Sequence, residues 1–325
     1  MEQCDWRPRC DPDTARLRAS MLQSARRYFH AIGVLEVDTP ALSVAAASDP
    51  QIESVGANLA VAGGREYYLH TSPEYCMKRL LCAGYPDIYQ ICKVFRDGES
   101  GRMHQPEFTM IEWYRHGLSL HEIICDCLAL IGDVLGDPGD FGEPATLNYR
   151  DAFIDKLGID PIRADIAALR DLSDADEDLA QALADDRDAW LDLLLSEKIV
   201  PSLPDDSPTV IYHYPASQAA LARLCPANNA VADRFEVFLG RVELANGYVE
   251  LTDPSEQQER FSKDQLQRQN RDQQLRPLDY EFLAAIRSGM PDCAGVAVGF
   301  DRLLMIRASE NDIRDIQTFD FAGPL

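Results

Sequence analysis

The sequence predicts an α+β fold in which a mainly antiparallel β-sheet is flanked by helices. Residues 88–95 and 107–114 alternate apolar and polar side chains with a period of two, and a polar turn separates them. Residues 234–239 and 242–248 have the same pattern around Gly240-Arg241, which is typical of a β-hairpin. Helical periodicity is found at residues 14–30, 119–135 and 280–289.

Composition narrows the function classes. The chain has 325 residues, enough for one large or two ordinary domains, and its 46% hydrophobic content is that of a soluble globular protein. With 31 basic and 54 acidic residues, the net charge of −23 makes tRNA or DNA an unlikely partner, since nucleic-acid affinity comes mainly from Lys and Arg. The nine cysteines include no Cys-x-x-Cys pair, so neither a disulfide framework nor a zinc site is supported. No membrane span or signal peptide is visible, so we expect a cytoplasmic protein without membrane attachment.

The N-terminal third begins with an expected flexible arm at residues 1–13. Asp13 or Thr14 is expected to cap the first helix, and a strand follows at residues 34–39. Further along, Ser72 is a plausible N-cap, Pro73 suits a first helical position, and Glu74 in the first turn is favoured by the helix dipole.

The turn between the first two strands concentrates positive charge in an acidic chain. It contains Arg96, Arg102 and His104, and Gly98 and Gly101 allow it to bend. The following strand contains Glu107 and Glu112. Cations beside inward carboxylates suit a substrate that has both phosphate and amine groups.

Residues 137–208 have a different character, with many aspartates among short Leu- and Ala-rich helices. We expect an acidic helical insertion whose charges are solvated and take no part in chemistry.

The second hairpin places polar residues in strands that are otherwise apolar. They are Glu236, Glu243, Asn246 and Glu250. Buried carboxylates are costly unless they are paired or bind a cation, so the cluster indicates a cation site, although any one of them could equally face solvent.

The last strand, residues 293–299, is built from small residues and leads into an apolar helix. Gly295, Ala297 and Gly299 leave room for a ligand against the backbone. Arg302 lies in the first helical turn, where the dipole disfavours a cation, so a bound anion such as a terminal phosphate explains it better than stability does.

These stretches together resemble the three signature motifs of class II aminoacyl-tRNA synthetases, from about residue 14 to near the end of the chain. The first is the helix and strand ending at Pro40, the second is residues 95–114, and the third is residues 299–302. The sequences Ser-Pro-Glu at 72–74, Pro-Glu-Phe-Thr at 106–109 and Glu-Leu-Ala-Asn-Gly at 243–247 indicate the lysyl branch. The resemblance implies an antiparallel sheet flanked by helices over residues 14–325.

Lysyl-tRNA synthetases carry an anticodon-binding domain before the first motif. In this sequence the first motif ends at Pro40, so we expect no such domain. The chain is therefore similar to the truncated lysyl-tRNA synthetase paralogues that modify translation elongation factor P. That family activates lysine, preferably (R)-β-lysine, with ATP and transfers it to the ε-amine of one lysine on the factor. Ala297 stands where lysyl-tRNA synthetases usually have Gly, and its methyl group would favour the β-isomer. A homodimer is implied by the first motif.

The resemblance also implies residue roles. Arg96 and Arg302 would be the catalytic cations, on the α- and γ-phosphates of ATP, and Glu236 and Glu243 would hold Mg²⁺. The residues implied to bind ATP are Arg96, Asp97, Gly98, Glu99, Arg102, His104, Gln105, Glu243, Leu244, Gly299 and Arg302. Those implied to bind the amino acid are Ser72, Pro73, Glu74, Glu112, Tyr114, Asn246, Glu250 and Ala297.

The sequence departs from the family pattern at two positions. Gly98 replaces a Glu that normally recognises the adenine amino group, so either Glu99 reaches in through a shifted turn or the backbone around Gly98 takes over. Gln105 replaces an Asn, a milder change that preserves the amide.

Two alternative functions stay open at this point. A tRNA-charging enzyme is opposed by the net charge of −23 and the missing domain. A non-catalytic regulatory paralogue is opposed by the retention of Arg96, Arg302, Glu236 and Glu243.

Overall fold

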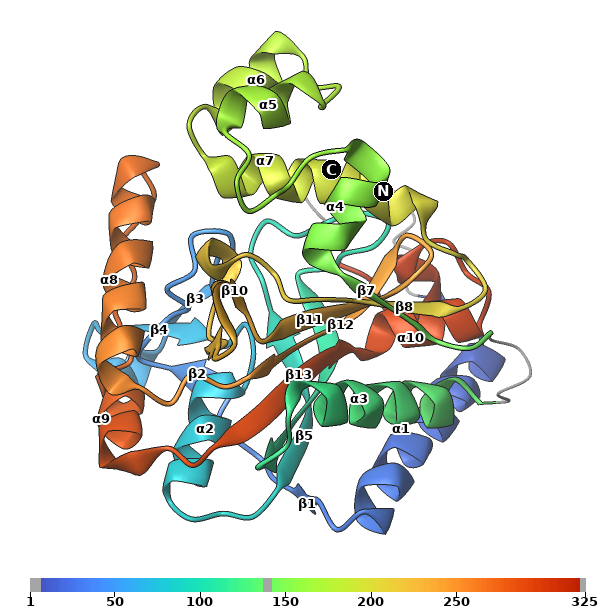
Figure 1. Ribbon diagram of the computed structural model, residues 1–325. Helices are drawn as coiled ribbons and strands as arrows, with labels where there is room; N and C mark the ends of the chain where they lie inside the picture. Colours follow the sequence, from blue (N-terminus) through green and yellow to red (C-terminus); the bar gives the residue numbers. More distant parts are fainter. Residues whose placement is uncertain (1–6, 137–141, 322–325) are drawn as a thin grey trace, which may run out of the picture. The chain divides into compact units, whose positions relative to one another are not determined.

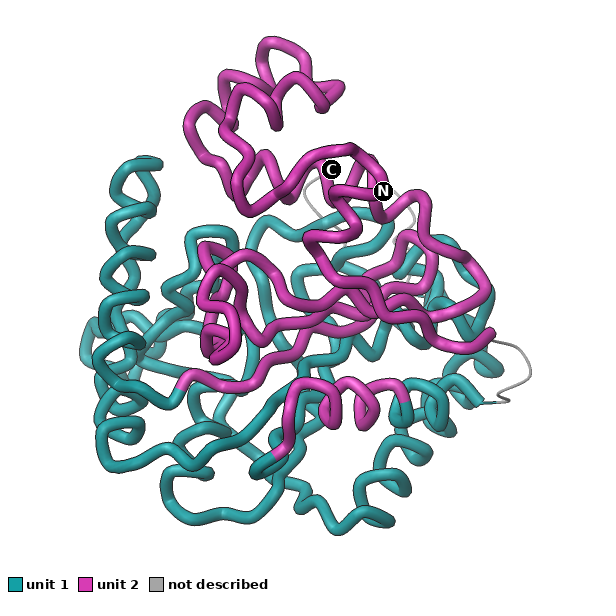
Figure 2. Tube along the Cα trace, viewed as in Figure 1, with its two compact units in different colours: residues 1–117, 129–136, 252–325 teal, residues 118–128, 137–251 magenta. Residues whose placement is uncertain are grey.

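The computed structural model describes residues 7–136 and 142–321 (Figure 1). The chain divides into two compact units (Figure 2). Unit 1 comprises residues 1–117, 129–136 and 252–325, and unit 2 comprises residues 118–128 and 137–251. Helix α3 (Leu120–Leu135) contributes residues to both.

Four strands of unit 1 follow the order β1-β5-β6-β13. Their bounds are β1 (Leu35–Glu36), β5 (Ile88–Phe95), β6 (Glu107–His116) and β13 (Cys293–Gly299). The β5–β6 and β6–β13 pairs are antiparallel, while β1 runs parallel to β5. A separate antiparallel sheet has the order β2-β4-β3, from β2 (Leu42–Ser43), β4 (Glu66–Leu69) and β3 (Gly56–Asn58).

The helices of unit 1 bury one face each. They are α1 (Pro12–Ala31), α2 (Glu74–Cys82), α8 (Pro254–Asn270), α9 (Tyr280–Gly289) and α10 (Phe300–Arg307), with 3₁₀ turns η1 (Ala60–Ala62) and η6 (Ile313–Ile316). Asp11 caps α1 by accepting from the Thr14 backbone N–H at 2.7 Å, so the expected cap at Asp13 or Thr14 is wrong. Of the expected arm, residues 1–6 lie outside the described part, and Arg9 N–H donates to the Thr318 carbonyl.

Four strands of unit 2 follow the order β12-β11-β8-β7. They are β7 (Ala145–Asn148), β8 (Pro208–Tyr212), β11 (Arg234–Leu239) and β12 (Val242–Val249); β9 (Leu224–Cys225) and β10 (Asn228–Ala232) form a small ribbon, and η5 spans Ala216–Gln218. The β8–β11–β12 pairs are antiparallel, and β7 is parallel to β8.

The expected helical insertion at residues 137–208 is helical over most of its described part, but it begins with strand β7. Residues 137–141 lie outside the described residues. The helices are α4 (Tyr149–Leu157), α5 (Ile166–Asp171), α6 (Glu177–Leu183), α7 (Arg187–Leu194), η3 (Leu195–Ile199) and η4 (Val200–Ser202). Their apolar faces share a core with strand residues Ile211 and Phe238, which explains why so acidic a segment folds.

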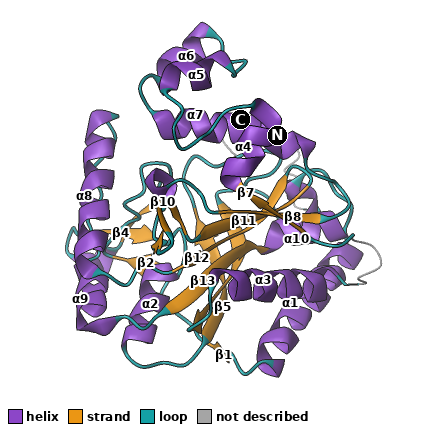
Figure 3. Cartoon of the chain, viewed as in Figure 1, coloured by secondary structure: helices purple, strands orange, loops and turns teal. Residues whose placement is uncertain are grey.

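Each unit thus combines a mainly antiparallel sheet with helices (Figure 3), and the predicted α+β fold is confirmed. Within the described residues, no helix combines the length and apolar character needed to cross a membrane.

Candidate active site

Glu112 is a carboxylate built into the interior of unit 1. It lies on β6, is 2% exposed, and accepts hydrogen bonds from the Ser72 hydroxyl and the Tyr114 hydroxyl, both at 2.7 Å. Burial, followed by the nearby charge of Glu74, raises the pKa of Glu112 to about 7. A buried acid of this kind is a ready partner for a ligand cation.

Ser72 links this acid to the start of α2. Its hydroxyl accepts from the Glu74 backbone N–H at 3.0 Å, but Pro73 occupies the N-cap position, so the predicted N-cap at Ser72 is wrong. The helix begins at Glu74, so Pro73 precedes it and is not its first residue.

Glu74 already has a cationic partner, Lys78, which was not predicted from the sequence. Lys78, one turn later on α2 and only 1% exposed, donates from its ammonium to the Glu74 carboxylate at 2.5 Å. The same ammonium lies 6.0 Å from the centre of the Tyr114 ring. Lys78 lies on the same buried side of α2 as Met77 and Leu81, and a lysine among apolar residues was the sequence feature that could have indicated this buried ion pair.

The β6–β13 register places the small residues of β13 beside the polar ones of β6. Ala297 pairs with Glu112 and Gly295 with Tyr114, while Gly299 pairs with Met110. Residues directly opposite each other point to the same face of a sheet. The small side chains therefore leave space over the face that presents Glu112 and Tyr114.

Arg96 follows the last residue of β5 and is placed by the hairpin. Its backbone N–H donates to the Pro106 carbonyl at 2.9 Å, and its guanidinium lies 5.1 Å from the centre of the Phe108 ring. Its Nε atom is buried without a hydrogen-bond partner. An arginine held by stacking, with a donor to spare, suits an anionic ligand.

The turn after Arg96 is closed by its own residues. Gly98 has φ +77°, a conformation that strains any residue with a side chain, and its N–H donates to the Asp97 carboxylate at 2.9 Å. Glu99 approaches Arg96 with an N–O distance of 3.7 Å. Glu99 therefore lies beside the cation expected at the phosphates, and the backbone conformation accounts for glycine at position 98.

Arg302 and His104 form a second cationic group. An Arg302 guanidinium nitrogen donates to His104 Nε2 at 2.7 Å, and Arg302 Nε reaches the Met103 carbonyl at 3.4 Å. The geometry orients Arg302 along the turn, with His104 as a neutral acceptor. Gly299 is the N-cap residue of α10, the helix that contains Arg302.

Two further predicted ATP residues make contacts within the protein. Gln105 is 1% exposed, donates to the His104 carbonyl at 3.1 Å and accepts from the Phe321 N–H at 3.1 Å. Arg102 reaches the Asn311 carbonyl at 3.4 Å. These contacts tie the turn to the C-terminal segment.

Unit 2 contains the second set of predicted residues, centred on Glu236. This β11 residue is 8% exposed and accepts from the Tyr214 hydroxyl and from the Arg234 guanidinium, both at 2.6 Å. Burial raises the pKa of Glu236, Arg234 opposes the rise, and Glu243 adds to it. Two carboxylates close enough to repel offer the hard oxygen ligands that Mg²⁺ prefers, so the residues fit that ion.

A β-bulge in β12 determines which residues share the face of Glu236. Asn246 pairs with Glu236, and Glu243 pairs with Phe238, with the register shift between them. Without the extra residue, Leu244, the spacing of three would put Glu243 and Asn246 on opposite faces. The Asn246 side-chain oxygen is buried without a partner, and Glu250, 1% exposed, follows the end of β12.

Residues that support the third motif were also missed. Asp301, 1% exposed, accepts from the Thr109 backbone N–H at 2.8 Å and from the Arg18 guanidinium at 2.5 Å. Arg18 lies on α1, so three distant segments meet at one buried carboxylate. The pair was not recognisable from spacing because its members are 283 residues apart.

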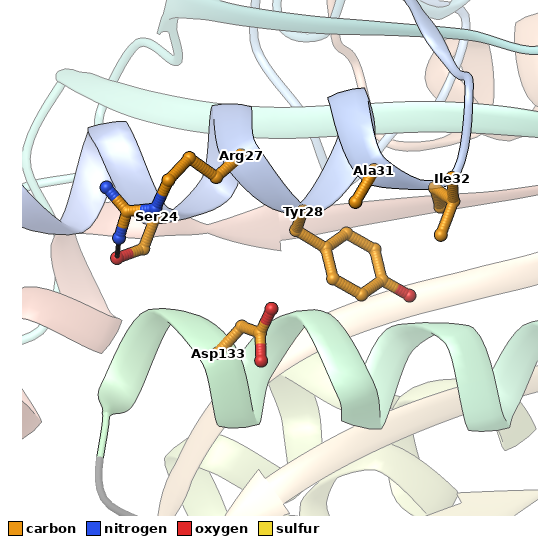
Figure 4. A pocket seen from close by; sticks show the side chains of 6 residues that line it. All are labelled: Ser24, Arg27, Tyr28, Ala31, Ile32 and Asp133. Atoms are coloured by element: carbon orange, nitrogen blue, oxygen red, sulfur yellow. Dashed lines mark hydrogen bonds between the residues drawn. The ribbon is translucent and has the colours of Figure 1, made fainter.

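Other groupings outside the predicted residues have structural explanations. An open hollow between α1 and α3, shown in Figure 4, is lined by Ser24, Arg27, Tyr28, Ala31, Ile32 and Asp133 and contains no predicted site residue. In unit 2, His213, Cys225 and Asp233 have ligand atoms within 4.8 Å of one another. Arg223 pairs with Asp233 at 2.9 Å, which accounts for this buried carboxylate without a metal ion.

Comparison with known proteins identifies the family. The model of the tRNA synthetases class II (D, K and N) matches residues 5–321. The chain belongs to this family. It is accordingly an ATP-dependent ligase, as predicted from the motifs.

Curated relatives indicate which branch of the family the chain is similar to. The elongation factor P–(R)-β-lysine ligase of Edwardsiella ictaluri is 42% identical over 325 residues, covering 98% of both chains. The proteins of the same name from Sodalis glossinidius and Vibrio cholerae are each 40% identical, covering 98% and 99% of both chains respectively. The predicted resemblance is confirmed at this level.

Proposed function

We propose that the protein activates lysine, preferably (R)-β-lysine, with ATP and transfers it to the ε-amine of a lysine on elongation factor P in the cytoplasm. Full-length similarity to ligases of that name supports the acceptor. The observation that supports the amino acid is the buried Glu112 carboxylate, held by Ser72 and Tyr114 beneath the small residues of β13.

The β5–β6 hairpin separates Glu112 from Arg96 along its strands. The Gln90–Glu112 pair lies five residue pairs before the Phe95–Glu107 pair, a distance of about 17 Å along the strands. An ammonium at Glu112 and the α-phosphate at Arg96 would therefore bind at separate points of one extended ligand. Ala297, directly across from Glu112, narrows the amine end and favours the β-isomer.

The ATP end uses cations from the turn and from α10. In the first step, a carboxylate oxygen of the amino acid attacks the α-phosphorus and pyrophosphate leaves, giving the aminoacyl-adenylate. Arg96 neutralises charge developing on the α-phosphate, and Arg302 holds the terminal phosphate. Glu236 and Glu243 would hold Mg²⁺, which neutralises charge on the triphosphate. In the second step, the acceptor amine attacks the carbonyl carbon and AMP leaves.

The two ammonium groups need oxygen acceptors, and the resemblance to the family supplies the candidates. Glu74 would take the amine nearer the carboxylate, while Glu112, Tyr114, Asn246 and Glu250 would serve the distal ammonium. Among the described residues, the Asn246 side-chain oxygen is buried without a hydrogen-bond partner, which supports a cation beside it. We expect a homodimer, as the first motif of the family implies.

Pyrophosphate exchange tests the activation step. The purified protein should exchange pyrophosphate into ATP with (R)-β-lysine, and less efficiently with lysine, but not without an amino acid. Absence of exchange with either substrate would favour a non-catalytic paralogue and reject the proposal.

Acceptor labelling tests the transfer step. With labelled amino acid, ATP and both acceptors present, label should appear on elongation factor P and not on lysine tRNA. A net charge of −23 opposes tRNA binding. Label on tRNA alone would replace the proposal by the tRNA-charging alternative.

A further inference from the structure

Gln90 is a buried amide whose side chain has no hydrogen-bond partner among the residues that the structure describes. It lies in the middle of β5 and is 2% exposed. Its side-chain nitrogen and oxygen are both buried, and neither has a hydrogen-bond partner. Nearly all buried side-chain amides are hydrogen-bonded, so both atoms of one amide without partners require an explanation.

The strand register places this amide next to the candidate amine pocket. Gln90 pairs with Glu112 on β6, and Glu112 pairs with Ala297 on β13. The three side chains thus form one row across three strands and point to the same face. Directly opposite residues have Cβ atoms about 5 Å apart, so the amide can reach a group bound at Glu112.

Cys92 shows that the polar groups on this face influence one another. Burial, followed by the charge of Glu112, raises the pKa of the Cys92 thiol to about 12, and the Gln90 side chain opposes the rise. The thiol is a weak partner for the amide, close enough for the amide to influence the thiol pKa but not at the distance and angle of a full hydrogen bond. Cys92 therefore does not satisfy Gln90.

Leaving the amide unsatisfied costs stability in the free protein. A buried polar group without a partner loses its hydration and gains nothing in return, whereas an apolar side chain of the same shape avoids that loss. Methionine matches glutamine in length and would be neutral or stabilising here. A glutamine at this position makes physical sense when its partner arrives with the substrate.

We propose that Gln90 is an amino-acid-binding residue whose side-chain oxygen accepts a hydrogen bond from the substrate ammonium held by Glu112. This deepens the proposed function and rests on it. An ammonium has three N–H donors, and Glu112 alone uses one or two of them. A neutral acceptor next to the acid completes the coordination without adding a second negative charge to a pocket that already contains Glu74.

The test compares Gln90→Met with a matched control in pyrophosphate exchange. The control is Thr209→Val on β8 of unit 2. It removes a buried hydroxyl that, like the Gln90 amide, lacks a hydrogen-bond partner among the described residues. For Gln90→Met we expect the KM for (R)-β-lysine and for lysine to rise about tenfold or more, because a hydrogen bond to a charged group is lost. The KM for ATP should stay within about twofold and the melting temperature should not fall. Thr209→Val should change neither KM.

Two further variants make the outcome decisive. Gln90→Asn keeps the amide but withdraws it by one methylene group, so it should also raise the amino-acid KM, and it serves if the methionine variant does not fold. Gln90→Glu keeps an acceptor oxygen and should bind the amino acid at pH 8 better than Gln90→Met does. An unchanged amino-acid KM in Gln90→Met and Gln90→Asn, with normal exchange by the wild type, overturns the inference alone. No exchange by the wild type overturns the proposed function and the inference with it.

Discussion

At the residue scale, the amine end of the candidate site depends on how charge is balanced around Glu112. The carboxylate is buried, close to Glu74, and near the buried cation Lys78. Lys78 is already in contact with Glu74, so it only partly compensates Glu112. The free protein therefore favours a proton on Glu112, and a substrate ammonium would favour its ionised form.

This balance predicts a pH dependence for amino-acid binding. The pKa of Glu112 is raised to about 7, so below that pH the substrate must displace a proton, and the KM for the amino acid should rise as pH falls, approaching tenfold per unit. Pyrophosphate exchange between pH 5.5 and 8.5 measures it. Glu112→Gln should have a raised KM that is flat over this range. A wild-type KM that is independent of pH would contradict the assignment.

Lys78 should contribute strongly to stability. Lys78→Met leaves the Glu74 and Glu112 carboxylates without their buried cation, and we expect a loss of about 2–4 kcal/mol in the free energy of unfolding. The neighbouring Arg79→Met is the control, because Arg79 pairs with Glu281 at the surface and should cost less than about 1 kcal/mol. Urea unfolding at pH 8 compares them. Equal losses in the two variants would show that Lys78 is not a buried counterion.

At the element scale, the hairpins were predictable and the distortions that complete them were not. Alternation over residues 88–95 and 107–114 predicted β5 and β6, although both faces are buried over residues 88–90 and 109–114. The bulge at Leu244 left no such signal, since it depends on how β12 pairs with β11. Likewise, Gly98 was recognised as a departure, but its cause, a positive φ, became visible only in the folded turn.

The loop before β3 supports the turn after Arg96 through a buried arginine. Arg268 of α8 is fully buried and donates to the Glu53 carboxylate at 2.6 Å and to the carbonyls of Ser48, Asp49 and Ile52. The Glu53 carbonyl in turn accepts from the Asp97 N–H at 2.9 Å. One helix thereby positions the turn through the loop.

Replacing Arg268 should therefore loosen the turn. Arg268→Met removes the buried donor to three carbonyls and one of the two arginines that bind Glu53, which keeps Arg276, and we expect a loss of about 3–5 kcal/mol in stability. Amide hydrogen exchange at Asp97 should accelerate. The control is Arg16→Met, which breaks the exposed Arg16–Asp13 pair. It should change neither the free energy of unfolding nor the amide exchange at Asp97. If the Asp97 amide is equally protected from exchange in Arg268→Met, the loop that contains Glu53 does not position the turn after Arg96.

At the scale of the whole molecule, the predicted site residues fall in both units, and this could not be seen from the motifs. The motifs predicted Glu112, Arg96 and Arg302, which lie in unit 1, and Glu236 and Glu243, which lie in unit 2. The acidic segment was expected to be a solvated insertion without chemistry. Its apolar side chains instead share a core with Tyr214, whose hydroxyl holds Glu236, so the segment supports a candidate Mg²⁺ ligand indirectly.

That shared core leads to a prediction about Mg²⁺. Trp190 of α7 is 1% exposed in the core that contains Tyr214, and Trp190→Ala should cost about 3–5 kcal/mol. As Tyr214 loses its packing, its hydroxyl should hold Glu236 less firmly, and half-maximal exchange should require more Mg²⁺ than in the wild type. Ile154→Ala, at an exposed position of α4, is the control. It should change the free energy of unfolding by less than about 1 kcal/mol and the Mg²⁺ concentration for half-maximal exchange by less than about twofold. A Trp190→Ala protein that is less stable but has an unchanged Mg²⁺ requirement would show that the insertion stabilises unit 2 without positioning Glu236.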